Sequence, residues 1–228
     1  MDQPKTKKER ALLIAKRAGG PVSLAEFRQA GIPQSTVRSL VLDGLLESPA
    51  RGVFVPPGAK LSEYADWALV AFRHPSSVVC LLSAASFHGM TQELPGKLSV
   101  AVPNSSTMPS MGDQFSLPLD VLVWRRQEMF EVGVEVKRID GVDVQVTSPE
   151  RTLVDLFRYS SLNSSMRSSA VRITDEMFLE SLERCHGGTL DHFSFESVSS
   201  IARVLGCYQT IRPYTKTMRF RRGDQLTL

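Results

Sequence analysis

Residues 23–44 read SLAEFRQAGIPQSTVRSLVLDG, and this stretch decides how the first part of the chain folds. Its apolar residues recur at helical spacing on both sides of the Gly-Ile-Pro turn at residues 31–33, which predicts two short helices. Ser23 and Glu26 form a capping-box pattern at the start of the first helix. Pro33 suits the first turn of the second helix, because the N–H that proline lacks needs no partner there. The stretch is typical of a helix-turn-helix.

The segments on either side extend this motif to a winged helix-turn-helix. A helix is predicted over residues 5–18, and Gly-Gly-Pro at residues 19–21 ends it. After residue 44, a Leu-Leu-Glu strand and a turn lead to the apolar strand at residues 52–55, a pattern typical of a β-wing. Pro-Pro-Gly then marks a boundary, so we expect a winged helix-turn-helix domain over residues 1–58.

The second helix of the motif is the candidate for contact with double-stranded DNA. Val37, Leu40 and Val41 are expected to face the small core. A helix with an unobstructed polar start can enter the major groove, where base edges distinguish all four base pairs. The candidate DNA-binding residues are therefore those on its outward face, namely Gln34, Ser35, Thr36, Arg38 and Ser39.

Basic residues outside this helix are candidates for contacts with phosphates. Arg51 lies on the predicted wing, where it could contact a phosphate or the minor groove, and Lys16 and Arg17 end the first helix. Residues 1–60 hold ten lysine and arginine residues against five acidic ones, a net charge of +5. The corresponding net charge is −6 for residues 61–206 and +4 for residues 207–228. This asymmetry indicates that the basic head, helped by the basic tail, meets a polyanion.

Residues 59–228 predict a second, mixed α/β domain with a small sheet and flanking helices, so the fold class of the chain is α+β. Asp140-Gly141 is expected to be the turn of a hairpin. A basic tail is expected after the last helix. The predicted strands are 98–102, 119–124, 132–139 and 142–146, and the predicted helices are 61–72, 83–88 with Ser83 as its cap, 149–159, 174–185 and 193–205.

Composition excludes several classes of protein. Of 228 residues, 42% are hydrophobic and 22% charged, as in ordinary globular proteins. No apolar run reaches the roughly 18 residues that a membrane span needs, and the apolar stretch at residues 11–15 is too short for a secretory signal. We therefore expect a cytoplasmic protein without a membrane partner. Cys80, Cys185 and Cys207 are dispersed, which predicts buried thiols and no disulfide or metal site.

The sequence offers two enzyme hypotheses. Ser83, His88 and Asp155 could be combined into a hydrolase triad, but no G-x-S-x-G elbow supports an exposed nucleophile. We interpret Arg151 and Asp155, four residues apart on a helix, as an ion pair or a buried structural link. No catalytic residue follows from this stretch.

The second enzyme hypothesis is a magnesium-dependent nuclease. Asp120 ends a Pro-Leu-Asp sequence, and Glu135-Val136-Lys137 follows fifteen residues later, a pattern similar to P-D…E-x-K. Two carboxylates and a lysine could hold Mg²⁺ and activate water. A further alternative is a regulator whose second domain senses a small molecule, although no cofactor fingerprint is present.

Four features, taken in order, resemble the AbiEi antitoxin family over nearly the whole chain. They are the winged-helix head, LLSAASFHGM at residues 81–90, VTSPERTLVD at residues 146–155 and RPY at residues 212–214. The TSPERTLVD stretch is the most specific of them, because a winged helix alone fits many regulators.

The resemblance implies a transcriptional regulator of a bacterial toxin–antitoxin (abortive infection) system. Family members bind inverted repeats in their own promoter through the head. Their second domain counteracts a nucleotidyltransferase-like toxin, often without a stable complex with it. By matching position, the resemblance gives the DNA role to the outward face of the second helix in residues 23–44. We therefore expect a non-enzymatic autorepressor and antitoxin without a cofactor.

Overall fold

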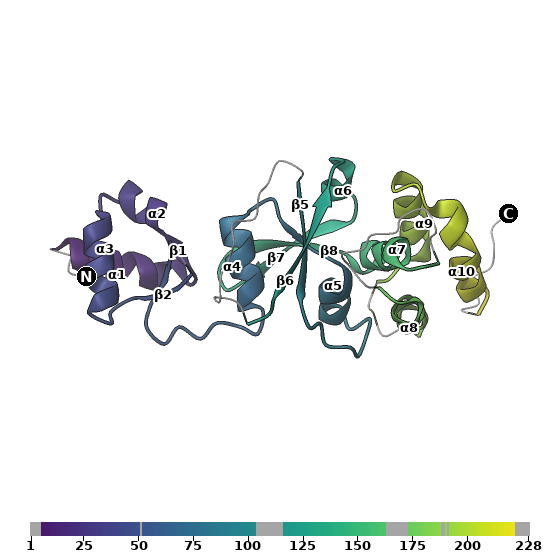
Figure 1. The fold of residues 1–228 in the computed structure, drawn as a ribbon, viewed down its shortest axis with the longest axis horizontal. Helices are drawn as coiled ribbons and strands as arrows, with labels where there is room; N and C mark the ends of the chain where they lie inside the picture. Colours follow the sequence, from purple (N-terminus) through teal and green to yellow (C-terminus); the bar gives the residue numbers. More distant parts are fainter. Residues whose placement is uncertain are drawn as a thin grey trace. The chain divides into compact units, whose positions relative to one another are not determined.

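The computed structural model describes residues 6–50, 52–103, 116–162, 173–187, 190 and 192–221 of the chain (Figure 1). Contacts between residues divide the chain into two compact units. The first unit comprises residues 1–75, 108–116 and 137–144, and the second comprises residues 76–107, 117–136 and 145–228. Helices and small sheets occur together, so the fold is α+β, as the sequence predicts.

The first unit begins with three helices, α1 (Lys7–Ala18), α2 (Leu24–Gln29) and α3 (Gln34–Leu42). The predicted capping box of α2 is present. The Ser23 hydroxyl accepts a hydrogen bond from the Glu26 N–H at 3.1 Å, and the Glu26 carboxylate accepts one from the Ser23 N–H at 2.7 Å. Pro33 occupies the N-cap position of α3, one residue before its first turn, without a side-chain capping hydrogen bond. The local sequence thus determines where these helices begin.

A three-stranded antiparallel sheet accompanies the helices. Its strands are β1 (Val22–Ser23), β2 (Glu47–Ala50) and β3 (Val53–Val55), in the order β1-β3-β2. Two of them are the strands that the sequence predicts, whereas β1 is not predicted. The core between sheet and helices holds nine buried side chains: Ala11, Ala15, Val22, Phe27, Ile32, Val37, Leu40, Leu46 and Phe54.

The first unit also contains α4 (Ala65–Arg73), which begins four residues later than predicted. The reason is a contact of Ser62 with Asp140 at the turn of a hairpin. Asp140 accepts hydrogen bonds from the Ser62 N–H at 2.9 Å and from its hydroxyl at 3.0 Å. Asp140 and Gly141 have φ values of 46° and 78°, as a two-residue hairpin turn of type I′ requires. The predicted hairpin is therefore confirmed.

A second sheet has five strands in the order β6-β5-β4-β8-β7. β5 runs parallel to β6 and antiparallel to β4, and β4 runs parallel to β8. Only the two-residue strand β4 is absent from the predicted set. The strands are β4 (Val78–Val79), β5 (Leu98–Pro103), β6 (Leu119–Trp124), β7 (Val134–Ile139) and β8 (Val142–Thr147).

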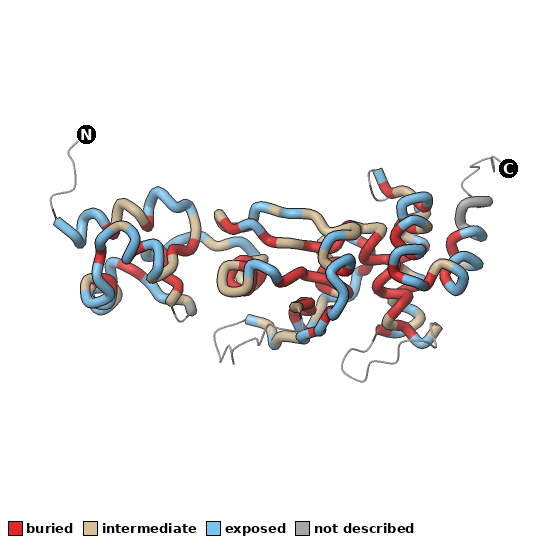
Figure 2. Tube along the Cα trace, turned by 90° about the horizontal axis from the view of Figure 1, so that it is seen from above, coloured by how far each residue is buried: buried red, intermediate tan, exposed pale blue. Residues whose placement is uncertain are grey.

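Helices pack on this sheet in the second unit, and α7 lies at the centre of the packing. α7 contacts α5, α8 and α9. Eight successive residues of α7, from Arg151 to Arg158, are buried, and Figure 2 shows the concentration of buried residues in this part of the chain. The helices are α5 (Leu81–Phe87), α6 (Glu128–Glu131), α7 (Pro149–Tyr159), α8 (Asp175–His186), α9 (Phe195–Val204) and α10 (Tyr208–Arg221).

One prediction for this unit is wrong. Ser83 does not cap α5, which begins at Leu81. Ser83 is buried inside the helix, where its hydroxyl accepts a hydrogen bond from the Ser99 N–H at 2.9 Å.

Most of the basic tail is helical, because residues 208–221 form α10. The sequence does not predict this helix. This helix contains Pro213, a residue that ordinarily interrupts helices. It is held by Tyr214, whose ring lies 5.7 Å from that of Phe157 and 5.6 Å from that of Phe178, measured between centroids. Among the described residues, every helix is too short or too polar to cross a bilayer.

Candidate functional site

The outward face of α3 is open to solvent. Gln34, Ser35 and Arg38 are exposed, while Thr36 and Ser39 are partly buried. On the opposite face, Val37 and Leu40 are fully buried and fix the rotation of the helix about its axis. The structure therefore brings the five predicted residues together on one accessible surface, which we call the α3 face.

Two members of the α3 face make hydrogen bonds within the first unit. The Arg28 guanidinium donates to the Gln34 side-chain oxygen at 3.1 Å, which joins α2 to α3. The Ser39 hydroxyl donates to Asp43 at 3.3 Å, and Lys8 donates to the same carboxylate at 2.7 Å. The hydrogen bond from Lys8 holds the pKa of Asp43 below its ordinary value.

The remaining polar side chains of the α3 face are Ser35, Thr36 and Arg38. Within the part of the chain that the structure describes, no hydrogen bond or ion pair engages them. Because residues 34–42 (QSTVRSLVL) include no acidic side chain, nothing on the helix itself neutralises Arg38. This guanidinium is free to meet an external acceptor.

Of the three basic residues predicted to contact DNA outside α3, the structure describes two. Lys16 and Arg17 lie in the last turn of α1 and are exposed. Arg51 lies outside the described residues. Its neighbour Gly52 has φ of 80°, and its carbonyl accepts a hydrogen bond from the Leu24 N–H at 3.3 Å. This bond ties Gly52 to the start of α2.

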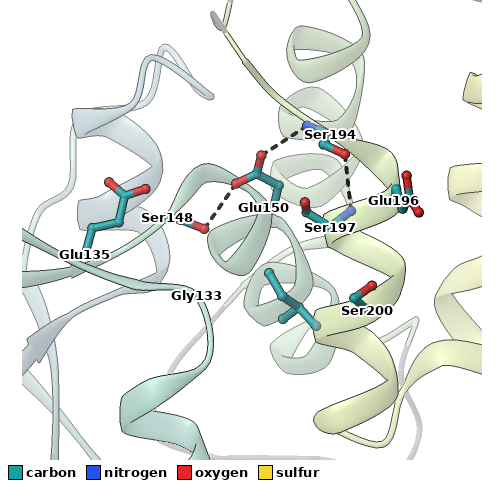
Figure 3. A pocket seen from close by; sticks show the side chains of 9 residues that line it. Gly133, Glu135, Ser148, Glu150, Ser194, Glu196, Ser197 and Ser200 are labelled. Atoms are coloured by element: carbon teal, nitrogen blue, oxygen red, sulfur yellow. Dashed lines mark hydrogen bonds between the residues drawn. The ribbon is translucent and has the colours of Figure 1, made fainter.

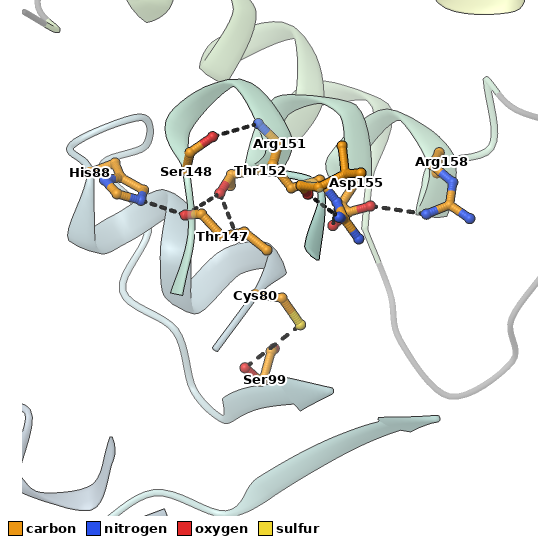
Figure 4. Close-up of polar contacts among 10 residues, drawn as sticks. Cys80, His88, Ser99, Thr147, Ser148, Arg151, Thr152, Asp155 and Arg158 are labelled. Carbon is orange, nitrogen blue, oxygen red and sulfur yellow. Dashed lines mark hydrogen bonds and ion pairs between the residues drawn. The ribbon is translucent and has the colours of Figure 1, made fainter. Parts of the chain in front are cut away.

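In the second unit, the motif at residues 147–155 builds the junction of β8 and α7 (Figure 4). Ser148 caps α7 by accepting a hydrogen bond from the Arg151 N–H at 3.2 Å. The hydroxyls of Thr147 and Thr152 lie 2.7 Å apart and share a hydrogen bond. These polar side chains are buried, and their hydrogen-bonding capacity is used within the fold.

The charged residues of the motif form a buried network. Arg151 donates from Nε to Asp155 at 2.8 Å, and both side chains are 0% exposed. Arg158 donates to the other oxygen of Asp155 at 3.0 Å. Arg151 also donates from Nη1 to the Val132 carbonyl at 2.5 Å, and its guanidinium lies 4.7 Å from the centroid of the Trp124 ring. The predicted structural link between Arg151 and Asp155 is confirmed.

The hydrolase triad does not assemble. The ring of His88 donates from Nε2 to the Thr147 carbonyl at 2.7 Å (Figure 4). Asp155 is bound by the two arginines, and the Ser83 hydroxyl holds strand β5 through Ser99 and the Lys97 carbonyl. Each of the three residues thus has separate partners, and no nucleophile–base pair is formed among them.

The nuclease pattern does not assemble either. Asp120 lies on β6 and Glu135 on β7, which are the opposite edges of the five-stranded sheet. Four strand spacings of about 4.8 Å separate them by roughly 19 Å. Two carboxylates that bind one Mg²⁺ each lie within about 2.1 Å of the ion. Asp120 and Glu135 therefore do not share a metal ion.

An acidic pocket of about 550 Å³ opens between the starts of α7 and α9 (Figure 3). Sequence reasoning missed it, because its residues are far apart in the chain. Glu150 joins the two helices, since it accepts hydrogen bonds from the Ser194 N–H at 3.0 Å and from the Ser148 hydroxyl at 3.1 Å. The residues lining this pocket are Gly133, Glu135, Ser148, Glu150, Ser194, Glu196, Ser197, Ser200 and Ile201.

The three cysteines are buried, as predicted, and no disulfide joins them to one another. Burial raises the pKa of the Cys80 thiol well above its ordinary value and that of Cys207 to about 11. Both side chains are therefore neutral thiols at physiological pH and serve as small apolar groups of the core.

Comparisons with known proteins add two kinds of finding. A family model described as "AbiEi antitoxin C-terminal domain" matches residues 77–184, and one described as "Transcriptional regulator, AbiEi antitoxin" matches residues 9–57. The fold is similar to that in the crystal structure of the RV2827C protein from Mycobacterium tuberculosis, with a TM-score of 0.54 and 15% sequence identity. That similarity covers 99% of this chain and 85% of the other. No curated protein sequence matches the chain.

Proposed function

Because the chain belongs to the AbiEi antitoxin family, we propose that it is the autorepressor and antitoxin of a bacterial toxin–antitoxin pair. In this proposal residues 1–58 form a winged helix-turn-helix that binds inverted repeats in the chain's own promoter. Residues 59–228 counteract a nucleotidyltransferase-like toxin. The role in transcription regulation belongs to the family, and the DNA site and the toxin are our inference.

The α3 face is the observation that carries the DNA-binding proposal. Its exposed residues Gln34 and Ser35 stand at the start of the helix, the end that enters the major groove in helix-turn-helix proteins. Arg38 follows one turn later and has no partner among the described residues. An arginine so placed can donate two hydrogen bonds to the O6 and N7 atoms of a guanine.

The flanking basic residues supply contacts that carry no sequence information. Lys16 and Arg17 on α1 and Arg51 on the proposed wing would neutralise phosphates of the duplex. Each phosphate neutralised releases counterions, so each contact steepens the loss of affinity with rising salt. Substitution of Lys16 or Arg17 is expected to reduce the slope of log affinity against log salt concentration by the share of about one phosphate contact. It should weaken binding to all DNA sequences equally.

A titration of a fluorescent promoter fragment with the full chain tests the DNA-binding proposal. Arg38→Ala and Arg51→Ala are each expected to weaken binding by about 1–3 kcal/mol, which is the loss for a base-specific or a desolvated contact. Arg125→Ala, which removes an exposed arginine of the second unit, is the matched control and should leave the affinity unchanged. Wild-type affinity in both Arg38→Ala and Arg51→Ala would reject the proposed interface.

Two core clusters in different parts of the chain support the proposed division of labour, while a smaller cluster packs Val53 of the head against Leu69 of α4. The buried cluster around Phe27 draws only on residues of the head, and the cluster around Phe157 draws only on residues after 77. We expect that the full chain carrying Arg38→Ala and Arg51→Ala still relieves growth arrest when it is expressed with the toxin from an independent promoter. Persistent arrest would show that neutralisation needs the DNA-binding head.

The proposal includes no enzymatic activity. The three residues of the hydrolase hypothesis each have other partners, and Asp120 and Glu135 lie on opposite sheet edges. Incubation of supercoiled DNA with the protein and Mg²⁺ is expected to leave the plasmid intact. Nicking that Glu135→Ala abolishes would restore the nuclease hypothesis.

A further inference from the structure

A second cavity of about 550 Å³ lies at the carboxyl ends of the parallel strands β5 and β6. We call it the β5–β6 pocket. Its volume falls in the range of small-molecule sites, about 300–1,000 Å³. None of the residues proposed above for DNA contact lines it. The residues that do are Ser76, Pro103, Trp124, Arg125, Arg126, Gln127, Phe130 and Gln145.

The strand register explains why a cavity forms here. Pro103 is paired with Trp124, and the pairing of Val78 with Ala101 places Ser76 opposite Pro103. Gln145 is paired with Val78 on the next strand. Three strands, β5, β6 and β8, and the turn before β4 therefore contribute residues to the floor of one cavity. Because residues two apart share a face of a sheet, this floor continues the face that carries the core residues Ala101 and Leu122.

The walls of the pocket consist of aromatic side chains and polar groups. Trp124 is buried, and the ring of Phe130 packs edge-on against it with centroids 5.3 Å apart. Phe130 itself is only partly buried and belongs to the cavity wall. The polar groups are two amides, a hydroxyl and two guanidinium groups. Such a mixture of apolar wall and few polar groups is typical of sites for small organic ligands.

The two arginines of the pocket differ in how far they are already engaged. Arg126 donates to the Val204 carbonyl at 3.1 Å and pairs with Glu128 at 3.5 Å. Arg125 is exposed, and among the described residues no acceptor binds its guanidinium. No acidic residue is among those that line the cavity. The pocket thus offers one uncommitted, permanently charged donor group, which suits a phosphate or carboxylate.

We propose that the β5–β6 pocket binds a small planar anion of the nucleoside monophosphate class. In this assignment Arg125 binds the phosphate, and Phe130 packs against the base. The Gln127 amide nitrogen already donates to Glu131 at 2.6 Å, and the Gln145 side chain contributes a polar group to the wall beside the ligand. The cavity is larger than inorganic phosphate alone would need, which favours a ligand with a ring over a bare anion.

Calorimetric titration of the full chain with the four common nucleoside monophosphates tests the proposal. At least one of them is expected to bind with saturation and at least tenfold more tightly than inorganic phosphate and than its own nucleoside. Arg125→Ala should weaken that binding at least tenfold, because a hydrogen bond to a charged group contributes about 1.5–3 kcal/mol. Arg212→Ala, an exposed arginine on α10, is the matched control and should bind as the wild type does.

A second variant separates recognition of the ring from recognition of the anion. Phe130→Leu should weaken the nucleotide several-fold while inorganic phosphate binds as before. Because Arg125 is exposed and unpaired among the described residues, the thermal midpoint of Arg125→Ala should match that of the wild type. Three results would overturn the proposal: no saturable heat with any nucleotide, phosphate binding as tightly as the nucleotides, or equal affinity in Arg125→Ala and the wild type.

Discussion

The helices α3 and α7 both carry polar motifs, and they use them in opposite ways. On α3 the polar residues face solvent, and three of them, including Arg38, have no partner among the described residues. On α7 the polar residues are buried, and Asp155 binds two arginines with its two oxygens. Polar side chains whose partners are internal support a fold, whereas those left without partners on a rigid helix are available for recognition.

The two helices also show that the motif most specific to the family is not the surface proposed to bind DNA. The stretch at residues 147–155 is the most specific part of the family resemblance, yet its side chains cap α7, join β8 to it and fill the core. The α3 face is built from residue types that many helices have. A distinctive motif therefore indicates shared architecture here, and the proposed function depends on a less distinctive surface.

The largest expected effect comes from breaking the network on α7. Asp155→Ala would leave Arg151 and Arg158 buried without their carboxylate, which costs about 3–5 kcal/mol of unfolding free energy. Urea unfolding measures this, with Glu183→Ala on the exposed face of α8 as control, expected within about 0.5 kcal/mol of the wild type. A loss below about 1 kcal/mol for Asp155→Ala would contradict the structural role of the motif.

A substitution beside the network is expected to have the next largest effect. Gly133 has φ of 65°, and a Cβ added there would lie 2.7 Å from the Cβ of Arg151. Gly206 has φ of 77° with nothing within 4 Å of an added Cβ. Both alanine variants carry backbone strain of about 1–2 kcal/mol, and overpacking adds about 1–3 kcal/mol at Gly133 alone. Equal unfolding free energies for the two variants would show that Arg151 moves away from the added Cβ without loss of stability.

Alkaline pH tests the environment next to Asp155. Burial, and then the charge of Asp155, raise the pKa of Tyr159 to about 12. A phenol with a raised folded-state pKa contributes stability that is complete below pH 10 and is lost as pH rises through 12. Between pH 9 and pH 11 the wild type should lose about 1.4 kcal/mol that Tyr159→Phe does not lose. Parallel losses in both proteins would show that Tyr159 titrates as an ordinary tyrosine.

The smallest effect is expected within the α3 face itself. The Ser39 hydroxyl already donates to Asp43 at 3.3 Å, whereas Ser35 has no such partner among the described residues. Ser39→Ala should therefore weaken promoter binding by less than about 0.5 kcal/mol, and Ser35→Ala by about 1 kcal/mol if its hydroxyl binds a base edge or phosphate. A larger loss for Ser39→Ala than for Ser35→Ala in the same titration would mean that the face is oriented differently on DNA.

The sequence predicts features that depend on neighbouring residues. The capping box at Ser23, the hairpin turn at Asp140 and the ion pair between Arg151 and Asp155 each involve residues at most four positions apart, and all are present. These features follow from local backbone geometry, which a single sequence carries in full.

The sequence does not predict features that depend on residues far apart in the chain. The two-residue strands β1 and β4 exist only because longer strands pair with them. α10 is a helix in spite of Pro213, because Tyr214 packs against Phe157 and Phe178. The two pockets collect residues from separate strands and helices, and their positions follow from a sheet order that no local pattern shows.

The most direct test of the contrast between α3 and α7 measures promoter affinity and unfolding free energy together for Arg38→Ala and Asp155→Ala. We expect Arg38→Ala to bind promoter DNA about tenfold or more weakly with unchanged stability. We expect Asp155→Ala to lose stability while its folded fraction binds DNA as the wild type does. Wild-type promoter affinity in a stably folded Arg38→Ala chain would contradict the proposed roles of the two helices.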